Sequence, residues 1–205
     1  MSLVVLISGR GSNLQAILDA GIPVSAVLSN VAGAGGLEIA ARRGIATKVV
    51  KHGDFPTREA FEEVLAAEVN RYSPKLVACA GFMRVMTAGF VGRYAGRMLN
   101  IHPSLLPSFT GLHTHERALA AGVKLHGCSV HFVTPDLDAG PIVIQAAVPV
   151  LANDTADTLS KRVLAQEHIV YPRAIQWFLG GQLVIENGRV NVRGNDAQYL
   201  VSDRA

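Results

Sequence analysis

The stretch LVVLISGRGSNLQAILDA, residues 3–20, decides the fold. Leu3 to Ile7 is a run of five branched aliphatic residues that stops at a glycine-containing turn, as a strand buried on both faces does. Ser12 or Asn13 is expected to cap the helix that follows, which runs through Ala20 with its apolar residues along one face. A fully buried strand that leads into a helix is typical of a parallel sheet covered by helices.

The alternation of buried strand and helix continues along the first half of the chain. This order predicts an α/β fold with a doubly wound, mostly parallel sheet of the Rossmann-like kind. After Pro107 two extended runs flank a polar connection, which predicts an antiparallel C-terminal extension of the sheet. Asp154 or Thr155 is expected to cap a long amphipathic helix, and Asn187-Gly188 predicts a tight hairpin. The expected strands are 3–7, 24–28, 47–50, 76–80, 98–101, 128–134, 142–150, 183–186 and 189–192, and the expected helices are 12–20, 35–43, 57–72, 87–94 and 154–178.

Length and composition limit what the chain can be. Its 205 residues, of which 49% are hydrophobic and 17% charged, exclude a disordered chain and suit a single domain, 1–205, with two lobes, 1–103 and 104–205. The net charge of +3, without a long run of Lys or Arg, argues against a nucleic-acid partner. No apolar run approaches the roughly 18 residues of a membrane helix, and the opening lacks the pattern of a signal peptide, so we expect a cytoplasmic protein without a membrane partner.

The loop Gly9-Arg10-Gly11-Ser12-Asn13 is the first candidate for binding chemistry. It joins the first strand to the first helix, where backbone N–H groups and the helix dipole favour an anion such as a phosphate. It lacks the lysine pattern of a P-loop, and it is an incomplete dinucleotide fingerprint because Leu14 stands where the third glycine belongs. A plain tight turn is the alternative interpretation.

Asn100 and His102, at the end of a buried strand, are the second candidate. Side chains two positions apart on a strand project from one face, so an amide and an imidazole converge there. A protonated imidazole and an amide N–H can both stabilise the oxygen of a tetrahedral intermediate in acyl chemistry. Asp138 or Asp136, in the polar connection between the two later extended runs, could favour the imidazolium if the sheet brings that loop to the same edge, and the spacing does not choose between them. Structural roles in loops are the alternative for all four residues.

Other polar residues give weaker signals. His113 and His115 lack an acidic or cysteine partner at metal-ligand spacing, and the two cysteines, Cys79 and Cys128, lie in apolar runs that are typical of reduced core thiols. We therefore expect no metal. Ser104 and Ser129 show no nucleophile elbow, which argues against a serine hydrolase.

Four segments together carry a family resemblance: ISGRGSNLQA at 7–16, AGFMR at 80–84, LNIHPSLLPSFTGLHTH at 99–115 and SVHFVTPDLDAGPI at 129–142. They closely resemble the folate-dependent glycinamide ribonucleotide formyltransferases (phosphoribosylglycinamide formyltransferases) of purine biosynthesis. The similarity extends from Leu3 to about Trp177, and HPSLLP with the downstream aspartate loop is its most specific part for the formyltransferase superfamily.

The resemblance implies transfer of a formyl group from 10-formyltetrahydrofolate, the co-substrate, to the amine of glycinamide ribonucleotide. It implies direct attack through an oxyanion intermediate and requires no metal. The folate would lie in a cleft formed by 83–86 and the 135–140 loop, with the second lobe completing it and two arginines near the glutamate tail. The implied catalytic residues are Asn100, His102 and Asp138; the implied ribonucleotide-binding residues are Gly11, Ser12, Asn13, Leu14 and Glu167; and the implied folate-binding residues are Arg58, Met83, Arg84, Val85, Met86 and Asn100.

Some positions depart from the family pattern, and relatives offer rival functions. Arg10 stands where a small or polar residue is usual, Ser108-Phe109-Thr110 replaces a basic, proline-containing stretch, and the chain after Gly181 carries no resemblance. Formyltetrahydrofolate deformylase usually has an added N-terminal domain and methionyl-tRNA formyltransferase an added C-terminal one, and the length of the chain argues against both. A non-catalytic folate- or phosphate-binding module is the third rival. A monomer and a homodimer are both compatible with the sequence.

Overall fold

The computed structural model describes residues 2–194 and 196–202, and the chain divides into two compact units. Unit 1 is Met1–Asn100 and unit 2 is Ile101–Ala205. The division falls inside one strand, so Asn100 belongs to unit 1 and His102 to unit 2. Each unit is described by itself below.

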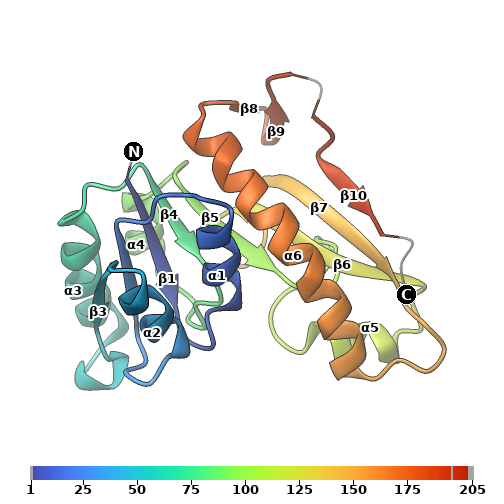
Figure 1. Ribbon diagram of the computed structural model, residues 1–205, viewed down its shortest axis with the longest axis horizontal. Coiled ribbons are helices and arrows are strands. Elements are labelled where there is room, and N and C mark those ends of the chain that lie inside the picture. Colours follow the sequence, from blue (N-terminus) through green and yellow to red (C-terminus); the bar gives the residue numbers. More distant parts are fainter. Residues whose placement is uncertain (1, 195, 203–205) are drawn as a thin grey trace. The chain divides into compact units, whose positions relative to one another are not determined.

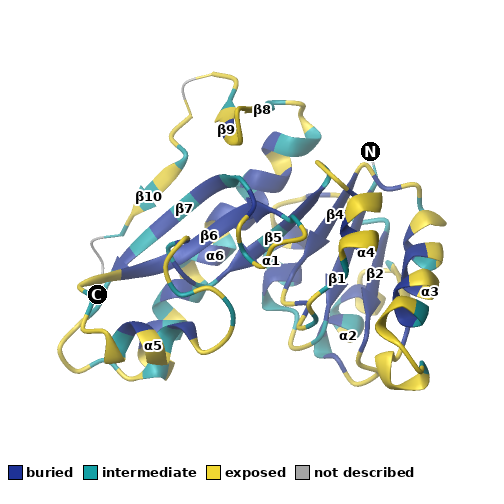
Figure 2. Ribbon diagram, turned by 180° about the vertical axis from the view of Figure 1, so that it is seen from behind, coloured by how far each residue is buried: buried dark blue, intermediate teal, exposed yellow. Residues whose placement is uncertain are grey.

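Unit 1 is a parallel sheet built around β1 (Leu3–Ile7), whose five residues are fully buried (Figures 1 and 2). The strand order is β5-β4-β1-β2-β3, and every neighbouring pair is parallel, as the buried runs predict. Parallel strands covered on both faces need apolar side chains on both faces, which is why β1, β2 and β4 are largely apolar runs, whereas β3 at the edge is mostly exposed. The other strands are β2 (Ala26–Ser29), β3 (Ala46–Val49), β4 (Leu76–Cys79) and β5 (Met98–His102).

Helices cover both faces of this sheet, as expected for a doubly wound fold. Helices α1 (Ser12–Asp19) and α2 (Gly35–Arg42) lie on one face, and α3 (Arg58–Asn70) and α4 (Ala88–Arg93) lie on the other (Figures 1 and 2). A short 3-10 helix, η1 (His52–Asp54), connects β3 to α3.

The start of α1 corrects one expectation. Neither Ser12 nor Asn13 is the cap: the N-cap is Gly11, in the left-handed conformation with φ 83°, and Ser12 is already helical. A residue without a Cβ adopts this conformation at little cost, so the turn itself starts the helix and no side-chain cap forms. By contrast, α3 and α4 begin at threonine caps, Thr57 and Thr87.

Unit 2 contains the expected antiparallel extension. Strand β6 (Leu125–Phe132) pairs antiparallel with β7 (Ile142–Pro149), with a register shift between Val130 and His131, and β10 (Tyr199–Val201) pairs parallel with β7. The predicted hairpin is confirmed as β8 (Leu183–Glu186) and β9 (Arg189–Val192). The sequence did not predict β10 or the short helix α5 (Thr114–Ala120).

Helix α6 (Ala156–Leu179) packs on β6 and β7. Thr155, not Asp154, is its cap, and it forms a capping box with Thr158. Asp154 instead accepts two hydrogen bonds from the Arg162 guanidinium, at 2.8 and 3.0 Å, and this pairing lowers the pKa of its carboxyl. Within the described part of the chain, no helix combines the length and the apolar character needed to cross a membrane.

Candidate active site

His102, the last residue of β5, is the centre of the candidate site in unit 2. Its side chain is buried, its Nδ1 lies 3.4 Å from Asp138 Oδ2, and its Nε2 lies 3.0 Å from the carbonyl oxygen of Phe109. Both ring nitrogens therefore face acceptors. Only the doubly protonated ring can donate to both, so this geometry suits the imidazolium.

A tight loop holds Asp138 in place. The residue has φ 52°, and its buried carboxylate accepts a 2.8 Å hydrogen bond from the Gly111 N–H. Two residues later, a Cβ on Gly140 would lie 1.8 Å from the Phe132 carbonyl oxygen, so only glycine fits this turn. Asp136 is exposed, and the carboxylate that faces His102 is that of Asp138.

His131 is a neighbour that the sequence did not single out. Its Nε2 lies 3.8 Å from Asp138 Oδ1, and its Nδ1 lies 2.9 Å from the Phe132 carbonyl oxygen. Burial lowers the pKa of this imidazole, so a neutral ring with Nδ1–H donating to that carbonyl fits the site. The register of β6 and β7 shifts beside His131, and no local sequence pattern indicates this shift.

The loop after His102 is held by side chains from the neighbouring strands. Ser129 Oγ accepts the Leu106 N–H at 3.0 Å and donates to the Ser104 carbonyl oxygen at 2.7 Å. The Gln145 amide donates to Ser129 Oγ at 2.8 Å and to the Leu106 carbonyl oxygen at 3.0 Å. Ser104 and Ser129 are thus fully buried supports of the loop.

The segment that departs from the family pattern, Ser108-Phe109-Thr110, lies directly against the site. Phe109 has φ 54°, and its carbonyl oxygen is the acceptor at His102 Nε2. Its ring makes an edge contact with His126 at 5.9 Å, and the Arg117 guanidinium lies 5.7 Å from the ring centroid. The unusual residue therefore has a defined place beside the catalytic candidates.

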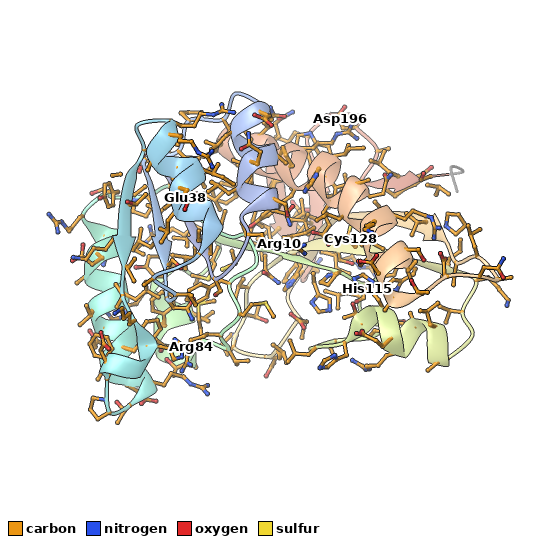
Figure 3. All side chains as sticks on the ribbon, turned by 60° about the horizontal axis from the view of Figure 1, so that its bottom comes forward. Arg10, Glu38, Arg84, His115, Cys128 and Asp196 are labelled. Atoms are coloured by element: carbon orange, nitrogen blue, oxygen red, sulfur yellow. The ribbon has the colours of Figure 1, made fainter. Side chains whose placement is uncertain are left out.

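His115 on α5 (Figure 3) contacts a second histidine, His126. Its Nδ1 lies 3.2 Å from Nε2 of the buried His126, and burial, with the nearby His115, lowers the pKa of His126 to about 4. His113 is exposed and lies 3.7 Å from the Glu116 carboxylate. Among residues 2–194 and 196–202, no three His, Cys, Asp or Glu side chains are grouped to hold a metal ion.

In unit 1, Gly11, in the loop at the start of α1, packs closely against Gly36. A Cβ on Gly11 would lie 2.4 Å from Gly36 Cα, and the Gly36 N–H donates to the Gly9 carbonyl oxygen at 3.2 Å. The helical hydrogen bonds of α1 begin with Gln15 N–H to Gly11, so the amides of 12–14 lie at the positive end of the helix. Arg10, labelled in Figure 3, is exposed on this loop.

The segment Met83–Met86 is also in unit 1, after β4. Met83 is 65% exposed and Val85 is 52% exposed, so two large apolar side chains face outward. Arg84, labelled in Figure 3, lies beside α3, with its guanidinium carbon 5.6 Å from the centroid of the Phe61 ring. Arg58 is exposed at the start of the same helix.

The structure thus brings together His102 and Asp138 in unit 2. The remaining candidates lie on helices, on strands and in the loops after β1 and β4. Asn100 lies on β5 opposite Cys79 of β4, and Glu167 is buried on α6. The roles that the resemblance assigns to these residues stay predictions.

Comparisons with known proteins agree on one family. Residues 1–175 match the family described as formyl transferase. The chain is 53% identical over 189 residues to a phosphoribosylglycinamide formyltransferase of Escherichia coli (strain K12), covering 89% of each chain. The solved structure of a phosphoribosylglycinamide formyltransferase from Coxiella burnetii has a TM-score of 0.91 and 48% identity, covering 98% of each chain. A formyltetrahydrofolate deformylase from Pseudomonas syringae has a TM-score of 0.86 but 25% identity, and 65% of that chain is covered.

Proposed function

The chain belongs to the formyl transferase family, and on this premise we propose that it transfers a formyl group from 10-formyltetrahydrofolate to the amine of glycinamide ribonucleotide in purine biosynthesis. The observation that carries the chemistry is His102, buried between the Asp138 carboxylate and a backbone carbonyl. Both substrates are small molecules, and the reaction needs neither a metal nor a nucleic acid. We place it in the cytoplasm.

The reaction proceeds by direct attack of the neutral amine on the formyl carbon. A C–N bond forms, and the former carbonyl oxygen becomes an oxyanion that accepts hydrogen bonds from the Asn100 amide and the His102 imidazolium. Asp138 faces Nδ1 of His102. The Nε2–H, which points at the Phe109 carbonyl oxygen in this structure, is therefore the group that donates a hydrogen bond to the oxyanion. The bond to the folate nitrogen then breaks, and a proton from the amine reaches that nitrogen through water and Asp138.

The ribonucleotide binds through its phosphate at the start of α1. Gly11, Ser12, Asn13 and the Leu14 amide surround the positive end of the helix, where an anion is stabilised without a bound metal. The buried carboxylate of Glu167 serves the ribose or glycinamide part, because a carboxylate accepts hydrogen bonds from hydroxyl and amine groups.

The folate binds to the exposed segment Met83–Met86 and to the 135–140 loop. Met83, Val85 and Met86 offer apolar surface for the flat ring system, and Arg58 and Arg84 offer charge for the glutamate tail. Asn100 belongs to both the folate site and the catalytic group. In this scheme residues 1–103 form the phosphate-binding lobe and residues 104–205 complete the folate site.

An assay of folate turnover tests this function. We expect turnover of 10-formyltetrahydrofolate only when glycinamide ribonucleotide is present, without stoichiometric formate. Formate release without an acceptor would instead identify a deformylase, the second candidate, to which the fold is also similar. No turnover in either condition would leave a non-catalytic binding module.

A further inference from the structure

A chain of three hydrogen bonds connects the Met83–Met86 segment to Asn30, directly after β2, and to His52 in η1, all inside unit 1. We propose that Ser8, Asn30 and His52 are positioning residues that fix this segment for the folate. The inference rests on the proposed function, because the segment matters to the reaction only if it binds the folate. None of the three residues is needed to contact either substrate.

The hydrogen bonds run in one direction, from the Met83 amide towards His52. The Met83 N–H donates to Ser8 Oγ at 2.8 Å, and the Ser8 hydroxyl then gives its one proton to Asn30 Oδ1 at 2.6 Å. With its oxygen occupied, Asn30 donates its amide N–H to His52 Nδ1, 3.2 Å away. Each acceptor thus fixes the orientation of the next group, and in this arrangement Nδ1 of His52 is the last acceptor.

Burial makes this arrangement costly to change. Asn30 is 4% exposed, so its amide has little access to water if a partner is lost. An unpaired buried polar group is penalised more than an exposed one, which favours the connected state. His52 is exposed at the end of the chain of bonds, and its ring makes an edge contact with Phe61 at 6.4 Å.

The other end of the segment is also fixed from α3. The Thr87 N–H donates to Glu62 Oε1 at 2.8 Å, the Thr87 hydroxyl donates to Glu62 Oε2, and Arg84 lies over Phe61. Phe61 therefore touches both His52 and Arg84. A backbone anchored at both ends presents Met83 and Val85 outward in one geometry, which lowers the ordering cost of binding a rigid ring system.

His52 is the best position to test, because it is exposed and lies far in sequence from the two proposed folate-binding segments, 83–86 and 135–140. His52→Ala removes the last acceptor and releases the Asn30 amide. We expect the KM for 10-formyltetrahydrofolate to rise about fivefold, which corresponds to roughly 1 kcal/mol for one hydrogen bond. The KM for the ribonucleotide and kcat should stay within about twofold of wild type. His52→Asn, whose amide oxygen can take the place of Nδ1, should restore the folate KM.

Asp54→Ala is the matched control, since Asp54 is exposed in the same 3-10 helix and outside the hydrogen-bond chain. Hydrogen exchange of the Met83 amide gives a readout independent of activity. We expect faster exchange in His52→Ala and Ser8→Ala, and wild-type exchange in Asp54→Ala. Equal exchange in all variants, or a folate KM that does not change in His52→Ala, would overturn the inference.

Two further outcomes separate this inference from the proposed function. An inactive wild-type protein that binds no folate would refute both, whereas an active wild type with an unchanged His52→Ala variant would refute the positioning role alone. If His52→Ala changed both KM values and kcat in parallel with its melting temperature, the three residues would be structural supports only, and the inference would be wrong.

Discussion

The surroundings of His102 shield its ring from water and place hydrogen-bond acceptors against it. Two acceptors face its two nitrogens, and the carboxylate beside Nδ1 is buried with it. A charge shielded from water interacts more strongly with its partner than an exposed one does. The proposed contribution of Asp138 to catalysis is therefore electrostatic, and it depends on a full negative charge.

We predict that Asp138→Asn lowers kcat about a hundredfold and changes either KM by less than about threefold. The amide keeps the shape of the carboxylate but removes the charge that favours the imidazolium. Steady-state kinetics of the variant check this. Asp136→Asn, an exposed position in the same loop, should retain wild-type kcat. A kcat for Asp138→Asn within threefold of wild type would exclude Asp138 from the chemistry.

For single residues, the sequence allowed predictions where a side chain lies on a strand. It did not allow them where the position of a side chain depends on the conformation of a loop. Asn100 and His102 are two positions apart in a strand, which is why the sequence predicts one face for both, and that prediction stays untested. The choice of Asp138 over Asp136 depends on a residue at φ 52°, which no local pattern indicates. His131 was missed for a similar reason, since the register shift beside it interrupts the alternation of β6.

Among the elements, β1, β2, β4 and β5 were the most predictable, because they are apolar and largely buried, whereas the edge strand β3 is mostly exposed. The N-cap of α1 was predicted at Ser12 or Asn13, whereas it is Gly11. The turn at Gly11 depends on its contact with Gly36, which lies 25 positions away in the sequence. Helix α5 was missed because His113, at its N-cap, has φ 57° and the turn before it has no apolar periodicity.

We predict that Gly11→Ala raises the KM for the ribonucleotide about tenfold or more and lowers the free energy of unfolding by about 1–3 kcal/mol. The new Cβ would meet the Gly36 backbone at 2.4 Å, and alanine is strained at φ 83°. Kinetics and urea unfolding measure both effects. Gly33→Ala is the control, because a Cβ there has open space, and its stability should change by less than about 0.5 kcal/mol. If Gly11→Ala binds the ribonucleotide normally, the loop is not the phosphate site.

For the molecule as a whole, fold class was predictable from the order of buried strands and helices. The C-terminal part was predictable only where a local signal exists. Asn187-Gly188 specifies the hairpin, with both residues at positive φ, whereas β10 joins β7 through a contact more than fifty residues apart in sequence. Such a pairing depends on the packing of the rest of unit 2, and no short pattern encodes it.

The stability of the protein should fall as the pH drops below about 6.5. Burial lowers the pKa of His126 from 6.5 to about 4, so the unfolded state binds the proton more readily over this interval. Stability is fully present above the unfolded value and is lost as the pH falls towards the folded one. Between pH 6.5 and pH 5 this amounts to about 1 kcal/mol, after allowing for screening by solvent.

Urea unfolding at pH 7.5 and pH 5.0 measures this effect. His126→Gln should show a smaller loss between the two conditions than wild type, and His113→Gln, at an exposed position, should lose as much as wild type. An equal loss in the wild type and in His126→Gln would assign the pH dependence to other groups.

The end of α6 supplies the protein with its own optical reporter. Trp177 is the one tryptophan of the chain, it is 4% exposed, and its indole N–H donates to Asp196 Oδ2 at 2.9 Å. Its emission therefore reports on the attachment of the segment that leads into β10. A shift of that emission to longer wavelength, without loss of helical circular dichroism, would signal that this segment detaches before the rest of the protein unfolds.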